Sequence, residues 1–354
     1  MSELGLKNID ADFEPLPTYS DLERDRIEDF SKIVPKLLIE VQHIEVDENC
    51  TSPKNDARER FFQTRKRTGE PLAYLAPEFA GLYTNQLNFN PNKSHGGKAS
   101  RHGVIFGDLN FGNGNNVPVA IKPFAVDYKR ATTEKECLND YFGNSAAYKL
   151  GVGGLQPVGI VDDAHENFYS LTVLQRSLDT FDNIDWSDFT INPELNIGMQ
   201  ELWNKAAHSI AVLHSMGDSY HGDLFLRNLA TNPEGNVFPI DWEYGDFSCI
   251  FSKDLKIRFF DRFKDLANLA KGMVAPINIG IESGAGMFMK SKQNWWILFQ
   301  QIFYTEYRSW RMELASQGKL HMKILESTKS ELEQLDIDLE TEITLLQRLF
   351  IGNA

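Results

Sequence analysis

The order of hydrophobic patterns along the chain constrains its fold more than any other feature. From about residue 82 to 173, short β-rich runs alternate with turns rich in Gly and Asn. From Asn196 onward, apolar residues return to helical spacing, as in ELWNKAAHSIAVLHSMG (201–217). A small β-rich part therefore precedes a larger helical part. The expected fold class is α+β with two lobes.

Two of the β-rich runs predict a hairpin. GVIFGDL (103–109) and VPVAIKPF (117–124) are joined by NFGNGNN, whose residues tolerate positive φ. After a helix-like segment, LQPVGIV (155–161) and NFYSLTVL (167–174) are two more strand candidates. The predicted order in this part is strands, one helix, strands.

The segment before residue 82 is predicted to be helical. Its apolar residues recur at helical spacing from Leu22 to Ile44, with Ser20 available as an N-cap. The expected organisation is an N-terminal helical extension (1–81), a β-rich N-lobe with an antiparallel sheet (82–175) and a helical C-lobe (176–354).

Charge and composition limit the partners. The net charge of −14 argues against a broad nucleic-acid surface, because binding to phosphate backbones depends on clustered Lys and Arg. The apolar run at 294–304 is broken by polar residues well short of a bilayer span, so no membrane segment is expected. Cys50, Cys137 and Cys249 lack the paired spacing of zinc or redox motifs, which fits a reducing compartment. A cytoplasmic location is expected.

The polar residues of HGDLFLRN (221–228) suggest phosphoryl transfer rather than a plain connecting loop. Asp223 and Asn228 are five positions apart, and Asp241 follows Asp223 by eighteen positions. Asp223 can accept the proton of an attacking hydroxyl, whereas Asn228 and Asp241 offer hard oxygen ligands to Mg²⁺. Arg227 has two interpretations: it neutralises charge on the transferred phosphoryl group, or it pairs with a local carboxylate.

These residues resemble the protein-kinase-like superfamily, and within it the aminoglycoside and choline phosphotransferase branch. The catalytic-loop pattern of that superfamily is matched by His221, Asp223 and Asn228, and its metal-binding Asp is matched by Asp241. The letters DWE stand where protein kinases carry DFG. The segment IDWEY is more similar to the corresponding segment of small-molecule kinases such as choline kinases.

The resemblance covers residues 82–275. Lys122, in a VAIK tetrad at the end of a predicted strand, matches the lysine that holds the α- and β-phosphates of ATP. Asp265 stands where a structural Asp braces the catalytic loop, and His221 has a structural role in the same loop. The resemblance implies a two-lobed protein-kinase-like fold that uses ATP and Mg²⁺.

The resemblance also implies a carboxylate partner for Lys122 on the helix that follows it. Three acids are available there, Glu134, Glu136 and Asp140. Glu136 is the chosen partner. The alternative role of Glu136 is structural, because with Thr133 it forms a capping box.

A loop that covers the phosphates is expected in SHGGKASRHG (94–103). Gly96, Gly97 and Ser100 can present backbone amides to the phosphates there. The segment lacks the GxGxxG spacing of protein kinases, and a solvent-exposed turn is the alternative interpretation.

Together these parts predict transfer of the γ-phosphate of ATP to a hydroxyl of a small molecule, with Lys122 and Mg²⁺ positioning the phosphate beside Asp223. No APE-like motif follows IDWEYGDFS, which favours a small-molecule acceptor or an unconventional protein substrate. The alternatives are an atypical Ser/Thr/Tyr protein kinase that also phosphorylates itself, and a non-catalytic nucleotide-binding module. A module that only binds has no evident need for the Asp223 side chain.

Overall fold

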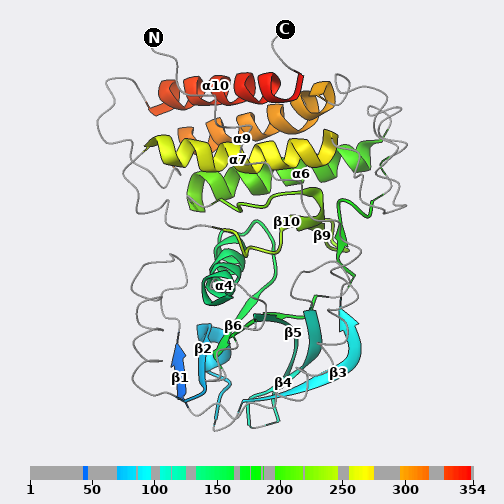
Figure 1. Ribbon diagram of the computed structural model, residues 1–354, viewed down its shortest axis with the longest axis vertical. Helices are drawn as coiled ribbons and strands as arrows, with labels where there is room; N and C mark the ends of the chain where they lie inside the picture. Colours follow the sequence, from blue (N-terminus) through cyan, green and yellow to red (C-terminus); the bar gives the residue numbers. More distant parts are fainter. Residues whose placement is uncertain are drawn as a thin grey trace.

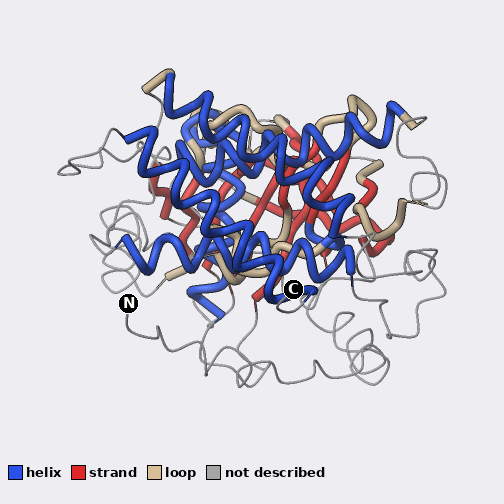
Figure 2. Tube along the Cα trace, turned by 90° about the horizontal axis from the view of Figure 1, so that it is seen from above, coloured by secondary structure: helices blue, strands red, loops and turns tan. Residues whose placement is uncertain are grey.

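The structure, a computed structural model, has a curled β-sheet at one end and a stack of helices at the other (Figure 1). Seen from the helical end, the helices lie in front of the strands (Figure 2). This arrangement confirms the mixed α+β class expected from the sequence. The structure describes residues 43–46, 70–84, 87–96, 104–112, 114–124, 133–162, 168–175, 177–184, 186, 196–217, 220–245, 255–274, 296–318 and 331–351.

The described strands form a seven-stranded sheet in the order β1-β2-β6-β7-β5-β4-β3. Neighbouring strands are antiparallel except for the parallel pair β1 and β2. A second sheet of three strands has the order β10-β9-β8. The strands are β1 (His43–Val46), β2 (Leu72–Leu75), β3 (Asn88–Gly96), β4 (Val104–Asn110), β5 (Asn116–Phe124), β6 (Pro157–Asp162), β7 (Phe168–Val173), β8 (Asp179–Thr180), β9 (Leu229–Thr231) and β10 (Val237–Pro239).

The predicted hairpin is confirmed as β4 and β5, whose pairing extends to Asn110 opposite Asn116. The other two predicted strands are confirmed as β6 and β7. Because β7 lies between β5 and β6, all four strands belong to one sheet. Lys122 of β5 therefore lies in the middle of the sheet, opposite Ser170 of β7.

The prediction of a helical extension is wrong at β1 and β2, which fall within residues 1–81 and belong to the main sheet. β2 is buried along its whole length and pairs with β6. Its four apolar residues lie between Pro71 and Pro77, and a run this short shows neither a helical nor a strand period. Residues 1–42 and 47–69 lie outside the described part of the chain.

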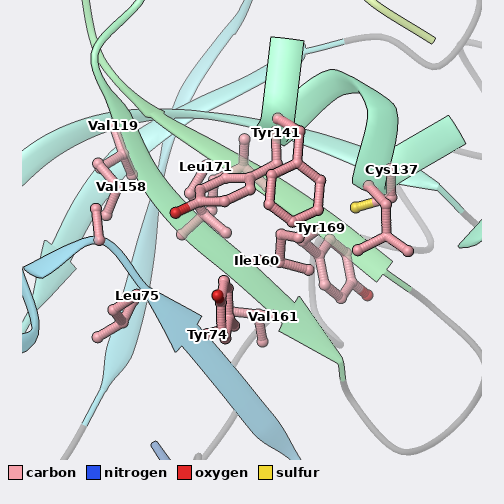
Figure 3. Packing of buried hydrophobic residues seen from close by; sticks show 14 of the residues in the cluster. Tyr74, Leu75, Val119, Cys137, Tyr141, Val158, Ile160, Val161, Tyr169 and Leu171 are labelled. Atoms are coloured by element: carbon pink, nitrogen blue, oxygen red, sulfur yellow. The ribbon is translucent and has the colours of Figure 1, made fainter. Parts of the chain in front are cut away.

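Helix α4 (Thr133–Lys149) packs on β5, β6 and β7 and closes the first hydrophobic cluster. In Figure 3, Cys137 and Tyr141 of this helix lie over Ile160 and Leu171 of the sheet. Cys137 is fully buried and serves as a small apolar side chain in this cluster. The helix is thereby held over the strand that carries Lys122.

A second hydrophobic cluster lies among the helices of the other end. The predicted helix at 201–217 is confirmed as α6, which continues into a π-helical turn (Leu213–Gly217). Asn196 caps α6, its side chain accepting a hydrogen bond from Met199 N at 3.3 Å. No helix within the described ranges is both long and apolar enough to cross a membrane. Besides α4, the α-helices are α3 (Pro77–Ala80), α6 (Ile197–Val212), α7 (Leu255–Val274), α9 (Thr305–Ser316) and α10 (Glu331–Ile351), and a π-helix (Phe299–Tyr304) precedes α9.

Candidate active site

The loop at residues 221–228 is anchored by Asp265 of α7. Asp265 Oδ2 accepts a hydrogen bond from His221 N at 2.5 Å, and Oδ1 accepts one from Gly222 N at 2.7 Å. Burial raises the pKa of Asp265 to about 6, against the opposing effects of His221 and the two amides. Asp265 thus holds the two backbone amides at the start of this loop.

Gly222 brings this loop into close contact with the segment that follows Asp241. Its φ is +80°, in the left-handed region. A Cβ at this position would lie well inside the van der Waals distance of the carbonyl oxygen of Tyr244. Only glycine satisfies both conditions, and sequence reasoning assigned this residue no role.

His221 ties the loop to the residue before Asp241. The backbone N–H of Asp223 donates to His221 Nδ1 at 3.3 Å, so the ring hydrogen must be on Nε2. Nε2–H then donates to the carbonyl of Ile240 at 2.8 Å. Burial lowers the pKa of His221, and its ring packs against Trp242 with centroids 4.7 Å apart. His221 is therefore neutral, and it links the loop to Ile240 through its ring.

The carboxylate of Asp223 is oriented by its two neighbours in the motif. Arg227 Nη2 lies 2.9 Å from Asp223 Oδ2, and Asn228 Nδ2 donates to the same oxygen at 3.0 Å. Among the described residues both side-chain contacts fall on Oδ2, and the Asp223 side chain is 22% exposed. Arg227 thus pairs with a local carboxylate, one of its two predicted roles, and its guanidinium lies 4.7 Å from the ring centroid of Phe225.

Asn228 and Asp241 are brought side by side by the backbone. Ile240 N donates to the carbonyl of Asn228 at 2.9 Å, which places the next residue, Asp241, beside the loop. The φ of Asp241 is +67°, and among the described residues Ser177 alone of the other non-glycine residues has a positive φ. Such strained backbone is concentrated at functional sites.

Lys122 joins the sheet to this loop. Its Nζ forms ion pairs with Asp241, with Glu243 Oε1 at 2.7 Å and with Asp140 Oδ1 at 3.6 Å. Burial works against the charge of Lys122, but the carboxylates of Asp241, Glu243 and Asp140 outweigh it and raise the pKa of Lys122. For Asp241, burial dominates over Lys122 and raises its pKa to about 7. One ammonium group thus faces three carboxyl groups.

The acid that α4 supplies to this cluster is Asp140. Besides Lys122, Asp140 Oδ2 accepts from Ser170 Oγ at 2.7 Å and Oδ1 accepts from Trp242 N at 3.3 Å. This differs from the choice of Glu136, which lies one helical turn earlier and is also buried. The two acids share one face of α4, so the sequence alone did not separate them.

Glu243 is the site residue that sequence reasoning missed. It forms an ion pair of 2.7 Å with Lys122. The available signal was the pair of acids two positions apart in IDWEYG. The residue between them, Trp242, is buried against Gly143 of α4, where any Cβ would overlap its ring.

The predicted phosphate-covering loop is placed only in part. Gly96 is the last residue of β3 and pairs with Val104 of β4. Gly97 and Ser100 lie outside the described residues. Binding of phosphates by these three residues stays a prediction.

The donors fit a magnesium ion held jointly with phosphate. Among the described residues, no group of three or more His, Cys, Asp or Glu side chains is arranged to hold a metal by itself. Mg²⁺ usually takes only one or two protein carboxylates and completes its shell with water and phosphate oxygens. Asp241 offers a carboxylate and Asn228 an amide oxygen for such a site, and magnesium binding by these two residues stays a prediction. The carboxyl groups around Lys122 outnumber its single positive charge, so they add negative charge next to Asp241 and Asn228.

Comparisons with known proteins add little. No protein-family model and no curated protein matches the sequence. One solved structure that matches is "WaaP in complex with acyl carrier protein", at 13% sequence identity and a TM-score of 0.32. The match covers 77% of this chain and 93% of that one. A TM-score this low carries no argument, so the function has to be argued from the site.

Proposed function

We propose that this protein is a kinase-like phosphotransferase that moves the γ-phosphate of ATP to a hydroxyl of a small molecule. The observation that carries the proposal is the convergence of Lys122, Asp223, Asn228 and Asp241. Lys122 and Asp241 are in ion-pair contact although they are 119 positions apart in the chain. The predicted phosphate ligand and the predicted metal ligand thus meet, and the candidate base lies beside them.

Asp223 has the geometry of a general base. The acceptor hydroxyl would give its proton to Asp223 Oδ1 while its oxygen forms a bond to the γ-phosphorus. The bond between that phosphorus and the bridging oxygen breaks, and ADP leaves with the electron pair. Arg227 and Asn228 keep the carboxylate oriented through Oδ2.

The remaining site residues would hold ATP and the metal ion. Lys122 would bind the α- and β-phosphates, as in the superfamily that the motif resembles. Asn228 and Asp241 would ligate Mg²⁺. Bound there, Mg²⁺ would neutralise charge on the phosphate oxygens. The protein's own part is to place these groups before the reaction begins.

The short connection after the site favours a small-molecule acceptor. Residues 242–254 are all that separates Asp241 from the start of α7, the helix that carries Asp265. A protein-kinase activation segment with an APE-like motif has no counterpart in that stretch. An atypical protein kinase is the second candidate, and its own phosphorylation would reveal it.

The test is ATP turnover with Mg²⁺ over a panel of hydroxylated metabolites, for the wild type, Asp223→Asn and the control Asp179→Asn. Asp179 is an exposed aspartate of β8. Loss of the base should lower kcat by about 10²- to 10⁴-fold, whereas the control should match the wild type.

The outcomes separate the candidates. Phosphate on a metabolite supports the proposal, and phosphate on the protein by intact mass, absent from Asp223→Asn, replaces it with a protein kinase. ATP binding without turnover, unchanged in Asp223→Asn, would overturn both and leave a nucleotide-binding module.

A further inference from the structure

A buried chain of hydrogen bonds runs from α9 to Asp265. Arg311 Nη1 donates to Tyr307 Oη at 2.7 Å. Tyr307 Oη lies 2.9 Å from His214 Nδ1, and His214 Nε2 lies 3.3 Å from Asp265 Oδ2. All four side chains are at most 4% exposed. The chain ends on the carboxylate that accepts the amides of the catalytic loop.

The hydrogen bonds in this chain point in one direction. Arg311 is a donor only and stays charged, so the oxygen of Tyr307 accepts and its hydrogen is directed to His214 Nδ1. The other ring nitrogen, Nε2, then carries the hydrogen and donates to Asp265. Burial, with Arg311 and Arg262, lowers the pKa of His214 well below its usual value, so the ring is neutral and carries a single hydrogen.

Arg311 is buried near an acidic residue of α10. Glu342 of α10 is buried, which raises its pKa, and Arg311 acts in the opposite direction on it. The Arg311 guanidinium also lies 5.6 Å from the centroid of the Tyr307 ring. Arg311 thus contacts both the hydroxyl and the ring of Tyr307.

We propose that Tyr307 and Arg311 are positioning residues for the catalytic loop. By fixing the tautomer of His214, they keep Asp265 turned toward the amides of His221 and Gly222. This inference rests on the phosphotransferase function proposed above, and it adds α9 as the element that sets the loop geometry.

The matched control is Tyr304, three residues earlier. It is also buried, and its hydroxyl contacts Leu339 O at 2.6 Å and Glu342 Oε2 at 3.1 Å, both on α10. Loss of this hydroxyl removes two buried hydrogen bonds to α10, and none of the hydrogen bonds in the chain to Asp265. Tyr304→Phe therefore shows what a merely structural loss would do.

The first measurement is hydrogen exchange at the amides of His221 and Gly222 in the full chain. Tyr307→Phe should speed exchange at these two amides by about tenfold, because the hydrogen bonds to Asp265 open more often. Tyr304→Phe should leave their exchange unchanged. Equal exchange rates in wild type and Tyr307→Phe, or the same acceleration in both variants, would overturn the proposal.

A double-mutant cycle tests the route through His214. Gln at position 214 carries a fixed N–H donor for Asp265 and does not depend on the Tyr307 hydroxyl for its tautomer. Tyr307→Phe should therefore have no further effect on exchange in a His214→Gln background. Additive effects would show that Tyr307 acts on the loop by another path.

The second measurement is kinetic. Tyr307→Phe should lower kcat about tenfold with KM for ATP unchanged, because Lys122 and Asp241 are untouched while Asp223 loses its exact placement. A raised KM for ATP with normal kcat would contradict the positioning role. If the wild type shows no turnover at all, the proposed function fails, and hydrogen exchange still decides the role of Tyr307.

Discussion

Lys122 Nζ and Glu243 Oε1 form a buried ion pair of 2.7 Å that joins the central strand β5 to the segment after Asp241. The same ammonium group also pairs with Asp140 and Asp241. One cation is therefore surrounded by three acids. The loss of the cation and the loss of one acid should consequently have very different effects.

Lys122→Met should lower the free energy of unfolding by about 3 kcal/mol or more, because the buried carboxyl groups of Asp140 and Glu243 and the partly exposed one of Asp241 are left without their cation. Glu243→Gln should lower it by much less, about 1 kcal/mol, since Lys122 keeps two acidic partners and no buried charge is left unpaired. Urea unfolding at pH 7 measures both values. Equal losses in the two variants would show that the cluster is not organised around Lys122.

Asp241→Asn should change the pH dependence of stability. The folded pKa of about 7 is above the ordinary value of 3.8, so the folded state binds this proton more tightly than the unfolded state does. The contribution of Asp241 to stability is therefore complete below pH 4 and is lost as the pH rises through 7. Unfolding free energies should be measured from pH 4 to 8. Over this range the stability of Asp241→Asn relative to the wild type should rise by roughly 3 kcal/mol. A constant difference over this range would rule out the raised pKa.

Gly222→Ala should be much more harmful than Gly114→Ala. Both glycines have a φ near +80°, so both variants bear the conformational penalty of about 1 to 2 kcal/mol. A Cβ at Gly114 meets nothing within 4 Å, whereas at Gly222 it overlaps with the carbonyl of Tyr244. Thermal unfolding and ATP turnover should both separate the two variants. Equal stability and turnover in the two variants would mean that the loop accommodates a Cβ at Gly222 at little energetic cost.

Arg227→Gln should reduce kcat by about tenfold, because Asp223 loses the partner that orients its carboxylate. Lys205→Gln is a matched control, since Lys205 forms an ion pair of the same i,i+4 spacing with Glu201 on the exposed side of α6. The control should keep the wild-type kcat. Stability should change little in either variant, because partly exposed ion pairs contribute at most about 1 kcal/mol. Unaltered turnover in Arg227→Gln would show that Arg227 has no role in catalysis.

Local patterns explain what could be predicted from the sequence. The β4–β5 hairpin follows from turn residues between two β-rich runs, and α6 follows from its helical spacing and the glycine at its end. The loop residues Asp223 and Asn228 lie in one short motif, so their proximity was predictable. Lys122 lies in the VAIK tetrad of one β-rich run, so its position near the end of a strand was predictable as well.

Tertiary packing decides what could not be predicted. Asp140 and Glu136 are one turn apart, and only the packing of α4 on the sheet places Asp140 at Lys122. Glu243 required knowledge of how the chain bends after Asp241, which has a positive φ. The contact between His214 and Tyr307 spans 93 positions, and no local pattern relates two such residues.

The ion pair between Lys122 and Asp241 has a consequence for the order of folding. It closes a stretch of 119 positions, and such a closure loses much chain entropy before any contact compensates for it. Hairpins such as β4–β5 close short loops, so we expect them to form early and the site to form last. The test uses a variant that keeps Trp242 as its sole tryptophan. Its fluorescence should change in the slowest phase of stopped-flow refolding, when the site forms. A fluorescence change in an early phase would contradict late formation of the site. Partly folded chains would then bind no nucleotide, so ATP affinity would appear only in the final step of folding.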